Sequence, residues 1–494
     1  MLAPEDYGWP EYIGALAILD GAELLDDRGR VRIEAVRRRL GAKLDLVPRF
    51  RQRLQRPRLG LGWPLWVDAP SFDLADHIRV RAVVPPGENE QVLQACEALL
   101  RRRLNPARPL WEIWILPGLP AGRVGLFVKL HHAVADGVAG IATLGALLDL
   151  SADTPTAETR GWTPAPVPAP GQLLRDNMRR RLRQVRVGLW HLATPIQTAR
   201  AVRYAPQWRE FFGWRPTPKT SLNRPIGAAR RLVLIPGRLE PIKQVARAHH
   251  ATVNDVILTA VTSGLGDLLR TRGEDVHELV LRALVPVSRH GRHPDQATGN
   301  RDAMMLVPLP LFEADPVRTL RLIAADTAVR KKQNHPQAAT GLMSWPVIQH
   351  LTTRLLARQR LLNLSVTNVQ GPPKPLYLTG AQLLELFPVV PLVGNLPLGV
   401  GVLSYAGQLN LTTVADPDAC SDVEVFARGV RGALDELVGG GRLLEAGETA
   451  DAARHHFAHR GLSGPATSSP VASSPASSGT SPPSTTTRRQ PAPR

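Results

Sequence analysis

Cysteine is almost absent from this chain, since Cys96 and Cys420 are the only two among 494 residues. Two thiols cannot build a disulfide framework, and they leave a structural zinc site without its usual ligands. Cys96 also belongs to an apolar stripe at helical spacing, with Val92, Leu99 and Leu100, which predicts a place in a protein core. We therefore assign neither thiol a catalytic role.

Long hydrophobic runs are lacking as well. No window approaches the roughly 20 apolar residues of a membrane-spanning helix. The opening MLAPEDYGWPEY is acidic and polar where a signal peptide would be basic and then apolar. We expect a cytoplasmic protein whose contact with a membrane is at most peripheral. Its length and its 43% hydrophobic content suit two large domains, or about three smaller ones.

Aspartate and glutamate are outnumbered by lysine and arginine, and the formal net charge is +18. Such an excess favours three kinds of partner: nucleic acid, an anionic membrane or a phosphorylated substrate. Nucleic acid is not expected, because the sequence has no zinc-finger spacing, no aromatic RNP-type motif and no heptads after a basic helix. Most of the cations are arginines scattered along the chain, so a bias in base composition also accounts for much of the excess.

What the sequence does contain is a polar loop between two apolar elements. Residues 124–130 have the length of a buried strand, and residues 138–150 have apolar side chains at helical spacing. Between them lies the sequence His131-His132-Ala133-Val134-Ala135-Asp136-Gly137. A loop held by rigid elements on both sides is a frequent position for chemistry.

The loop has the groups that acid–base catalysis needs. A neutral imidazole such as His132 can take a proton from a hydroxyl at neutral pH and return it to a leaving group. Asp136 can orient that ring or hold the loop in shape, and Gly137 lets the backbone turn sharply. Three alternatives to catalysis stay open: a metal site, although adjacent side chains diverge and no further ligands cluster nearby; buried structural histidines; and a chance pattern such as His249-His250, which has no aspartate four residues on.

Composition divides the chain into four segments. Residues 1–150 alternate strands and helices around the histidine loop, and residues 151–220 are a Pro-rich linker followed by a basic connector. Residues 221–462 form a second block of strands and helices. Residues 463–494 are a Ser/Pro/Thr-rich tail that should be disordered. The predicted fold class is α/β, or α+β.

The connector, segment 173–214, predicts a cationic amphipathic helix. Among its many arginines, apolar residues interleave at steps of three or four: Leu174, Met178, Leu182, Val185 and Leu189. One interpretation is attachment to an anionic membrane or a lipid droplet. The other is a helix packed on the protein with a solvated, charged face.

The histidine loop matches HHxxxDG, the signature of the CoA-dependent acyltransferase superfamily, which includes peptide-synthetase condensation domains. Further motifs resemble one branch, the bacterial wax ester synthase/diacylglycerol acyltransferase family. They run in the family's order from about residue 10 to residue 440: Gly14-Ala15-Leu16, Pro48-Arg49-Phe50, Arg108-Pro109-Leu110-Trp111-Glu112, Thr220-Ser221-Leu222-Asn223, Ile226-Gly227, Val253-Asn254-Asp255-Val256, Val285-Pro286-Val287-Ser288, Gly299-Asn300 and Thr367-Asn368-Val369-Gln370-Gly371-Pro372. Gln370 stands where the family usually has proline, so this turn is less stiff, but no catalytic atom is lost.

The resemblance implies two similar chloramphenicol-acetyltransferase-like lobes that face each other across a central tunnel, with the histidine loop at its middle. It implies acyl transfer from a long-chain acyl-CoA to the hydroxyl of diacylglycerol or a long-chain alcohol. No cofactor or metal is expected, because acyl-CoA is a substrate. His132 is then the general base, His131 a supporting residue, and Asp136 a mainly structural one with Arg289 as its expected partner.

The roles implied for the other motifs are less direct. Thr367 or Asn368 is the expected donor to the oxyanion of the tetrahedral intermediate, or lines the tunnel. Asn254 and Asp255 either shape the tunnel or only cap a helix, and Trp111 with its neighbours is expected to pack rather than touch the acyl chain. Two rival functions remain: a condensation-type, amide-forming domain, which normally adjoins a carrier domain, and a non-catalytic lipid- or membrane-binding relative.

Overall fold

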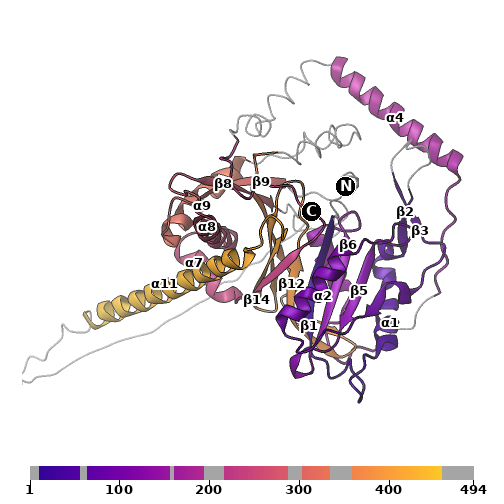
Figure 1. Ribbon diagram of the computed structural model, residues 1–494, viewed down its shortest axis with the longest axis horizontal. Coiled ribbons are helices and arrows are strands. Elements are labelled where there is room, and N and C mark those ends of the chain that lie inside the picture. Colours follow the sequence, from indigo (N-terminus) through magenta and orange to yellow (C-terminus); the bar gives the residue numbers. More distant parts are fainter. Residues whose placement is uncertain are drawn as a thin grey trace, which may run out of the picture. The chain divides into compact units, whose positions relative to one another are not determined.

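The computed structural model describes residues 11–55, 64–155, 161–193, 216–287, 303–333 and 359–458. The chain divides into a large compact unit, Met1–Gly441, and a second unit, Arg442–Arg494. Two six-stranded sheets with helices packed on them organise the large unit (Figure 1). The predicted α/β class is confirmed.

The first sheet has the strand order β11-β12-β1-β6-β5-β4. Its strands are β1 (Tyr12–Leu19), β4 (Ile78–Val80), β5 (Trp111–Leu116), β6 (Val124–His131), β11 (Tyr377–Leu378) and β12 (Ala381–Val389). β1 is antiparallel to both β6 and β12 and therefore lies in the middle of the sheet. A separate two-stranded sheet pairs β2 (Gln52–Gln55) with β3 (Leu65–Asp68).

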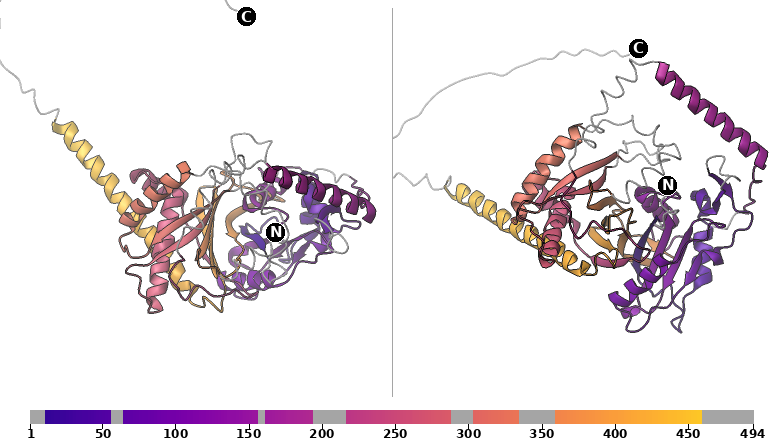
Figure 2. Two further views of the ribbon diagram at one scale, coloured as in Figure 1. Left: turned by 90° about the horizontal axis from the view of Figure 1, so that it is seen from above. Right: turned by 45° about the horizontal axis from the view of Figure 1, so that its top comes forward.

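The alternation of side chains along β1 decides which helices cover each face of this sheet. Ile13 and Ala15 face a core that contains residues of α1 (Ile33–Gly41) and α3 (Gly137–Leu147). Tyr12 and Leu16 face the opposite core, which contains α2 (Asn89–Arg101) together with residues of the second sheet. α2 therefore lies at the junction of the two sheets and contacts a strand of each. Figure 2 shows the sheets and helices from two further directions.

The second sheet has the order β7-β14-β13-β10-β8-β9. Its strands are β7 (Arg231–Ile235), β8 (Val280–Val287), β9 (Ala303–Pro310), β10 (Leu364–Gln370), β13 (Leu398–Tyr405) and β14 (Gln408–Ala415). The strands β13 and β14 form an antiparallel hairpin.

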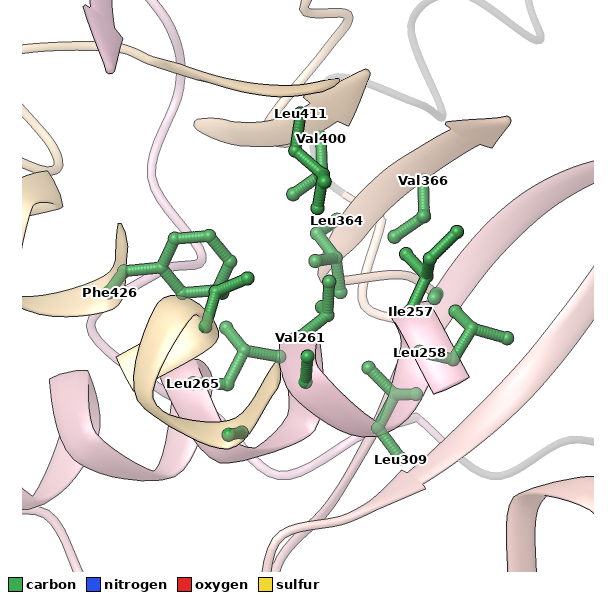
Figure 3. Packing of buried hydrophobic residues seen from close by; sticks show 14 of the residues in the cluster. Ile257, Leu258, Val261, Leu265, Leu309, Leu364, Val366, Val400, Leu411 and Phe426 are labelled. Atoms are coloured by element: carbon green, nitrogen blue, oxygen red, sulfur yellow. The ribbon is translucent and has the colours of Figure 1, made fainter. Parts of the chain in front are cut away.

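The core of the second sheet is built around α8 (Val253–Thr271), which is buried on most of its circumference. Figure 3 shows Ile257, Val261 and Leu265 of this helix among side chains of β10 and Phe426 of α11 (Val423–Ala458). The helices α7 (Leu239–Ala248) and α9 (Pro316–Gln333) pack against α8. Burial on most sides explains why the apolar residues of α8 are not confined to one narrow stripe.

The remaining described elements are short or lie in the connector. Four 3-10 helices span Leu44–Leu46, Pro48–Arg51, Leu74–Asp76 and Pro120–Gly122 in the described part of the chain. The connector contains α4 (Pro170–Ala193), so the predicted helix is present, while residues 194–215 lie outside the described residues. Among the helices that the structure describes, none is long and apolar enough to cross a membrane.

The predicted domain boundaries differ from the arrangement of the sheets. Residues 221–462 were expected to form one lobe, yet β11 and β12 of this segment belong to the first sheet, where β12 pairs with β1. The reason is that an apolar pattern predicts a buried strand without identifying its partner. At the edge of the same sheet, β4 is short and ends at Val80. The tail, 463–494, lies outside the described residues.

Candidate active site

The histidine loop lies between β6 and α3, as predicted. β6 ends at His131 and α3 begins at Gly137. Asp136 is the N-cap of α3: its backbone is extended, and its carboxylate oxygen Oδ1 accepts a hydrogen bond of 2.8 Å from the main-chain N–H of Ala139. A short acidic side chain at this position accepts a hydrogen bond from an otherwise unpaired N–H group. Its negative charge also interacts favourably with the positive end of the helix dipole. Asp136 therefore has a structural role at the end of the loop.

His131 faces inward. Its side chain is buried, its ring atom Nδ1 accepts a 2.9 Å hydrogen bond from the N–H of Ala133, and its ring meets Tyr12 edge to face at 6.1 Å between centroids. An Nδ1 that accepts a hydrogen bond places the proton of the neutral ring on Nε2. His131 thus folds the chain back just before the active loop, which is consistent with a supporting role.

His132 is half-buried, and its main-chain N–H donates to the carbonyl oxygen of Glu11 at 2.8 Å. Burial lowers the pKa of its imidazole below the ordinary value of 6.5, while the charge of Asp136 and a contact with its own main chain raise the pKa in part, and His131 lowers it. The ring is therefore neutral at pH 7, which is the state a general base requires.

The second sheet reaches the loop through β10. A Cβ atom placed on Gly137 would lie 3.4 Å from Val369 Cγ2 and 3.9 Å from Thr367 Cγ2. Thr367 and Val369 are on one face of β10, so Asn368 points to the other face, toward the side that α8 covers. Of the two predicted oxyanion donors, only Thr367 thus faces the histidine loop.

Gly137 does not have a left-handed backbone, because it is not among the residues with positive φ in the described chain. It forms the first residue of α3 instead. A Cβ atom here would make ordinary van der Waals contact with Val369, so packing does not exclude a side chain. The role of Gly137 in the turn from the loop into α3 stays a prediction.

Asp255 has a structural role. The N-cap Thr252 and Asp255 form a reciprocal capping box at the start of α8, and the second oxygen of the Asp255 carboxylate accepts a 2.7 Å hydrogen bond from Thr327 of α9. Asp255 is buried and both its oxygens are engaged, so the helix-capping interpretation is confirmed. Asn254 is half-buried beside it, and a tunnel-lining role for Asn254 stays a prediction.

Trp111 packs, as expected. Its indole N–H donates to the carbonyl of Phe50 at 2.8 Å, and its ring stacks on Phe50 at 4.5 Å and on His77 at 4.4 Å between centroids. The adjacent Leu110 accepts the main-chain N–H of His131 at 3.0 Å. The motif around Trp111 therefore supports the histidine loop from the side of β5.

Lys129 is a residue near the loop that the motifs did not reveal. It is fully buried two positions before His131, donates to the carbonyls of Leu99 (2.9 Å) and Arg102 at the end of α2, and lies 4.1 Å from the ring centre of Tyr12. Burial lowers its pKa to about 8. A single charged residue inside the apolar run 124–130 was the signal in the sequence.

The described residues include neither an exposed thiol nor a cluster of potential metal ligands. Cys96 and Cys420 are both buried, and burial raises the pKa of the Cys420 thiol to about 12 and that of Cys96 further still. Protonated buried thiols are poor nucleophiles. No group of three or more potential metal ligands occurs among the side chains that the structure describes.

Two other predictions, the partner of Asp136 and the central tunnel, concern the surroundings of the loop. Arg289, the expected partner of Asp136, lies outside the described residues, as do residues 288–302 as a whole. A hollow of about 640 Å³ lies between α8 and α11, lined by residues such as Thr262, Arg270 and Arg428. It includes none of the predicted site residues, and the central tunnel stays a prediction.

Comparison with known proteins identifies the family. The model of the wax ester synthase/diacylglycerol acyltransferase catalytic domain matches residues 1–257, and that of the C-terminal domain of the same family matches residues 298–438. A probable diacylglycerol O-acyltransferase of Mycobacterium tuberculosis is 33% identical over 434 residues, which cover 86% of this chain and 91% of that protein. A putative diacylglycerol O-acyltransferase of the same species is 30% identical over 411 residues, 79% of this chain and 80% of the relative.

Solved structures share the fold. The wax ester synthase/diacylglycerol acyltransferase of Marinobacter aquaeolei superposes with a TM-score of 0.64 at 22% identity, over 89% of this chain and 97% of that one. The first condensation domain of the calcium-dependent antibiotic synthetase reaches 0.58 at 16% identity, over 88% and 93%. Both family models and the relatives above point to the lipid branch of this fold. The chain belongs to the wax ester synthase/diacylglycerol acyltransferase family.

Proposed function

We propose that this protein transfers a long-chain fatty acyl group from acyl-CoA to the hydroxyl of diacylglycerol, and also to long-chain alcohols. The observation that carries the proposal is His132: a half-buried imidazole, neutral at pH 7, in an HHxxxDG loop that meets β10 of the second sheet. Family membership and the names of the relatives support the choice of substrates.

The proposed reaction is a direct transfer. His132 removes the proton of the acceptor hydroxyl while the oxygen attacks the thioester carbon, which forms a tetrahedral intermediate. The intermediate collapses, the carbon–sulfur bond breaks, and the imidazolium returns its proton to the departing CoA sulfur. The products are an ester and free CoA, and His132 is neutral again. A step through an acyl-enzyme is not needed, which suits the buried, protonated thiols.

The intermediate carries a negative oxygen that needs a donor. Thr367 supports this role better than Asn368, because it lies on the face of β10 that meets Gly137. Loss of one such donor costs about 3 kcal/mol of transition-state stabilisation in other enzymes. No cofactor enters the proposed scheme, and chelation with EDTA should leave the rate unchanged.

The test is His132→Ala, assayed with palmitoyl-CoA and diacylglycerol and followed by CoA release with a thiol reagent. Loss of one general base should slow transfer by about a hundredfold or more. His277→Ala is the matched control, because His277 is exposed on a loop of the second lobe. Unchanged turnover in His132→Ala contradicts the mechanism, and a wild-type protein that never releases CoA favours the non-catalytic relative.

We propose further that α4 holds the enzyme on an anionic lipid surface, at the inner face of the plasma membrane or on lipid inclusions. Leu174, Met178 and Leu182 follow one face of α4 at steps of four and are 46%, 53% and 63% exposed. On the other side, Leu173 and Asn177 are buried. An exposed apolar stripe is costly in water, and lipid acyl chains are the natural environment for it.

Charge supports the same partner for α4. Arginines flank the apolar stripe at positions 175, 179, 180, 183 and 186, and acidic residues are few along the helix. Each basic residue near an anionic membrane contributes about 1 kcal/mol of binding free energy. The proposed acceptors are themselves lipids, so attachment would bring the enzyme to its substrate.

Vesicle co-sedimentation tests the attachment. The triple variant Leu174→Ser/Met178→Ser/Leu182→Ser should bind vesicles containing phosphatidylglycerol at least about tenfold more weakly, because three apolar side chains no longer insert. Leu46→Ser/Val84→Ser/Leu150→Ser removes equally exposed apolar groups elsewhere and is the control. Equal binding by the α4 variant and the wild type contradicts the proposal, as does equal binding to purely zwitterionic vesicles.

A further inference from the structure

We propose that the C-terminal end of α2 binds the phosphate groups of the CoA moiety of the donor. The inference rests on the proposed acyl-CoA-dependent activity and adds a place for the nucleotide end of the substrate. Three consecutive arginines, Arg101, Arg102 and Arg103, are exposed where α2 ends. Arg79 and Arg81, both half-buried, lie on the neighbouring edge of the first sheet.

The arginines share a small region. The guanidinium carbons of Arg79 and Arg102 lie 5.5 Å and 5.4 Å from the centre of the same indole ring, that of Trp114. Within the described residues, none of the five arginines forms an ion pair with a carboxylate. Clustered like charges repel each other, so such a group is a natural site for a ligand with several negative charges.

The carboxylates nearby are already engaged. Glu97 accepts the main-chain N–H of Leu232 at 2.9 Å and lies 3.9 Å from Arg231. Glu112 accepts the indole N–H of Trp114 at 3.1 Å. Asp76 pairs with Arg108 at 2.7 Å. The arginine cluster at the end of α2, defined as residues 79, 81 and 101–103, therefore keeps its positive charge for a ligand.

The last carbonyl groups of any helix attract cations, but at the end of α2 these carbonyls already have a cationic partner. The ammonium group of Lys129 donates to the carbonyls of Leu99 and Arg102, which are among the last carbonyls of α2. Lys129 is fully buried and so not available to an external ligand. The exposed arginines are thus not needed to satisfy the end of the helix.

The distance from the arginine cluster to His132 suits the length of the acyl-CoA donor. Trp114 pairs with Phe127 in the first sheet, and Phe127 stands five residues before His132. Five residues of strand correspond to roughly 16 Å. An extended pantetheine arm covers such a span between the thioester carbon and the diphosphate. The cluster also lies on the α2 side of the sheet, which faces the second lobe.

A buried guanidinium group, that of Arg230, lies inward of the cluster, and the buried carboxylate of Asp416 at 4.0 Å balances its charge. Arg230 is 8% exposed and lines a small hollow together with Tyr12 and Leu100, the residue that precedes Arg101. Its Nη1 donates to the carbonyls of Gly227 and Ala229, whereas its buried Nη2 makes no hydrogen bond to any described residue. Tyr12 in turn contacts His131. The small hollow therefore lies between the end of α2 and the histidine loop, and the paired Arg230 adds no free charge to the surface cluster.

The test compares two donors with the same acyl chain. Palmitoyl-CoA carries the phosphates, and palmitoyl-N-acetylcysteamine presents the same thioester without them. In Arg101→Gln/Arg102→Gln/Arg103→Gln, the KM for palmitoyl-CoA should rise about tenfold, as expected for three exposed charge contacts. The kcat and the KM for the N-acetylcysteamine thioester should not change. The inhibition constant of adenosine 3′,5′-bisphosphate should rise by the same factor as the KM.

The matched control is Arg28→Gln/Arg32→Gln/Arg38→Gln, which removes three exposed arginines around α1, one of them in the last turn of that helix. The proposal is overturned if the KM for palmitoyl-CoA stays constant, if both donors are affected equally, or if the control behaves like the α2 variant. Single variants of Arg101 and Arg103, each with about a twofold effect, serve if the triple variant does not fold. A wild-type enzyme inactive with palmitoyl-CoA refutes the proposed function instead.

Discussion

Replacing Asp136 separates its two effects on the histidine loop. Its carboxylate caps α3 through the 2.8 Å hydrogen bond from Ala139, and its charge raises the pKa of His132. Asp136→Asn keeps a cap and removes the charge, whereas Asp136→Ala removes both. Asparagine and aspartate are about equally good N-caps, so Asp136→Asn should lose no more than about 0.5 kcal/mol of unfolding free energy. Asp136→Ala should lose about 1 kcal/mol.

The pH dependence of activity follows from the sign of the charge effect. A negative charge favours the protonated imidazole, so its loss lowers the pKa of His132 beyond the lowering that burial already causes. The acid limb of the kcat/KM profile should therefore move to lower pH in both variants, by about one unit or less. A base of lower pKa is also weaker, so the plateau should fall modestly.

Urea unfolding and pH–rate profiles of the two variants check both effects. An acid limb that moves to higher pH would refute the assignment of the charge effect. If Asp136→Asn is destabilised as much as Asp136→Ala, the cap is not the main structural contribution. The carboxylate charge would then have a stronger partner than the N–H of Ala139.

Three further predictions concern packing, capping and the wild-type pH profile. Trp111→Ala should lower the unfolding free energy by about 3–5 kcal/mol, because it leaves a large cavity and frees the carbonyl of Phe50; an unchanged urea midpoint would contradict this. Asp255→Ala should cost about 2–3 kcal/mol, since Thr252 and Thr327 both lose a buried partner, and the loss should be smaller in a Thr327→Val background if the two residues act together. In the wild type, the acid limb of kcat/KM should lie below pH 6.5, because burial lowers the pKa of His132; a limb above 6.5 would point to a different base.

Local chemistry was readable from the sequence at the centre of the site. The histidine loop, the strand before it and the helix after it depend on residue types and on periodicity over a few residues, and β6 and α3 lie where these patterns predicted. The capping role of Asp255 was also readable, because a capping box spans only four positions. Lys129 was visible as a charge inside an apolar run, but its partners were not, since they lie about 30 residues earlier at the end of α2.

By itself, then, the sequence determined the family, the reaction it favours and the identity of the proposed base. Tertiary structure alone decided that β12 completes the first sheet, that Thr367 rather than Asn368 faces the loop, and that arginines at the end of α2 gather without acidic partners in the described chain. Periodicity describes which face of an element is buried. Which distant elements pack against that buried face depends on the packing of the whole chain. The same packing determines the surroundings of His132.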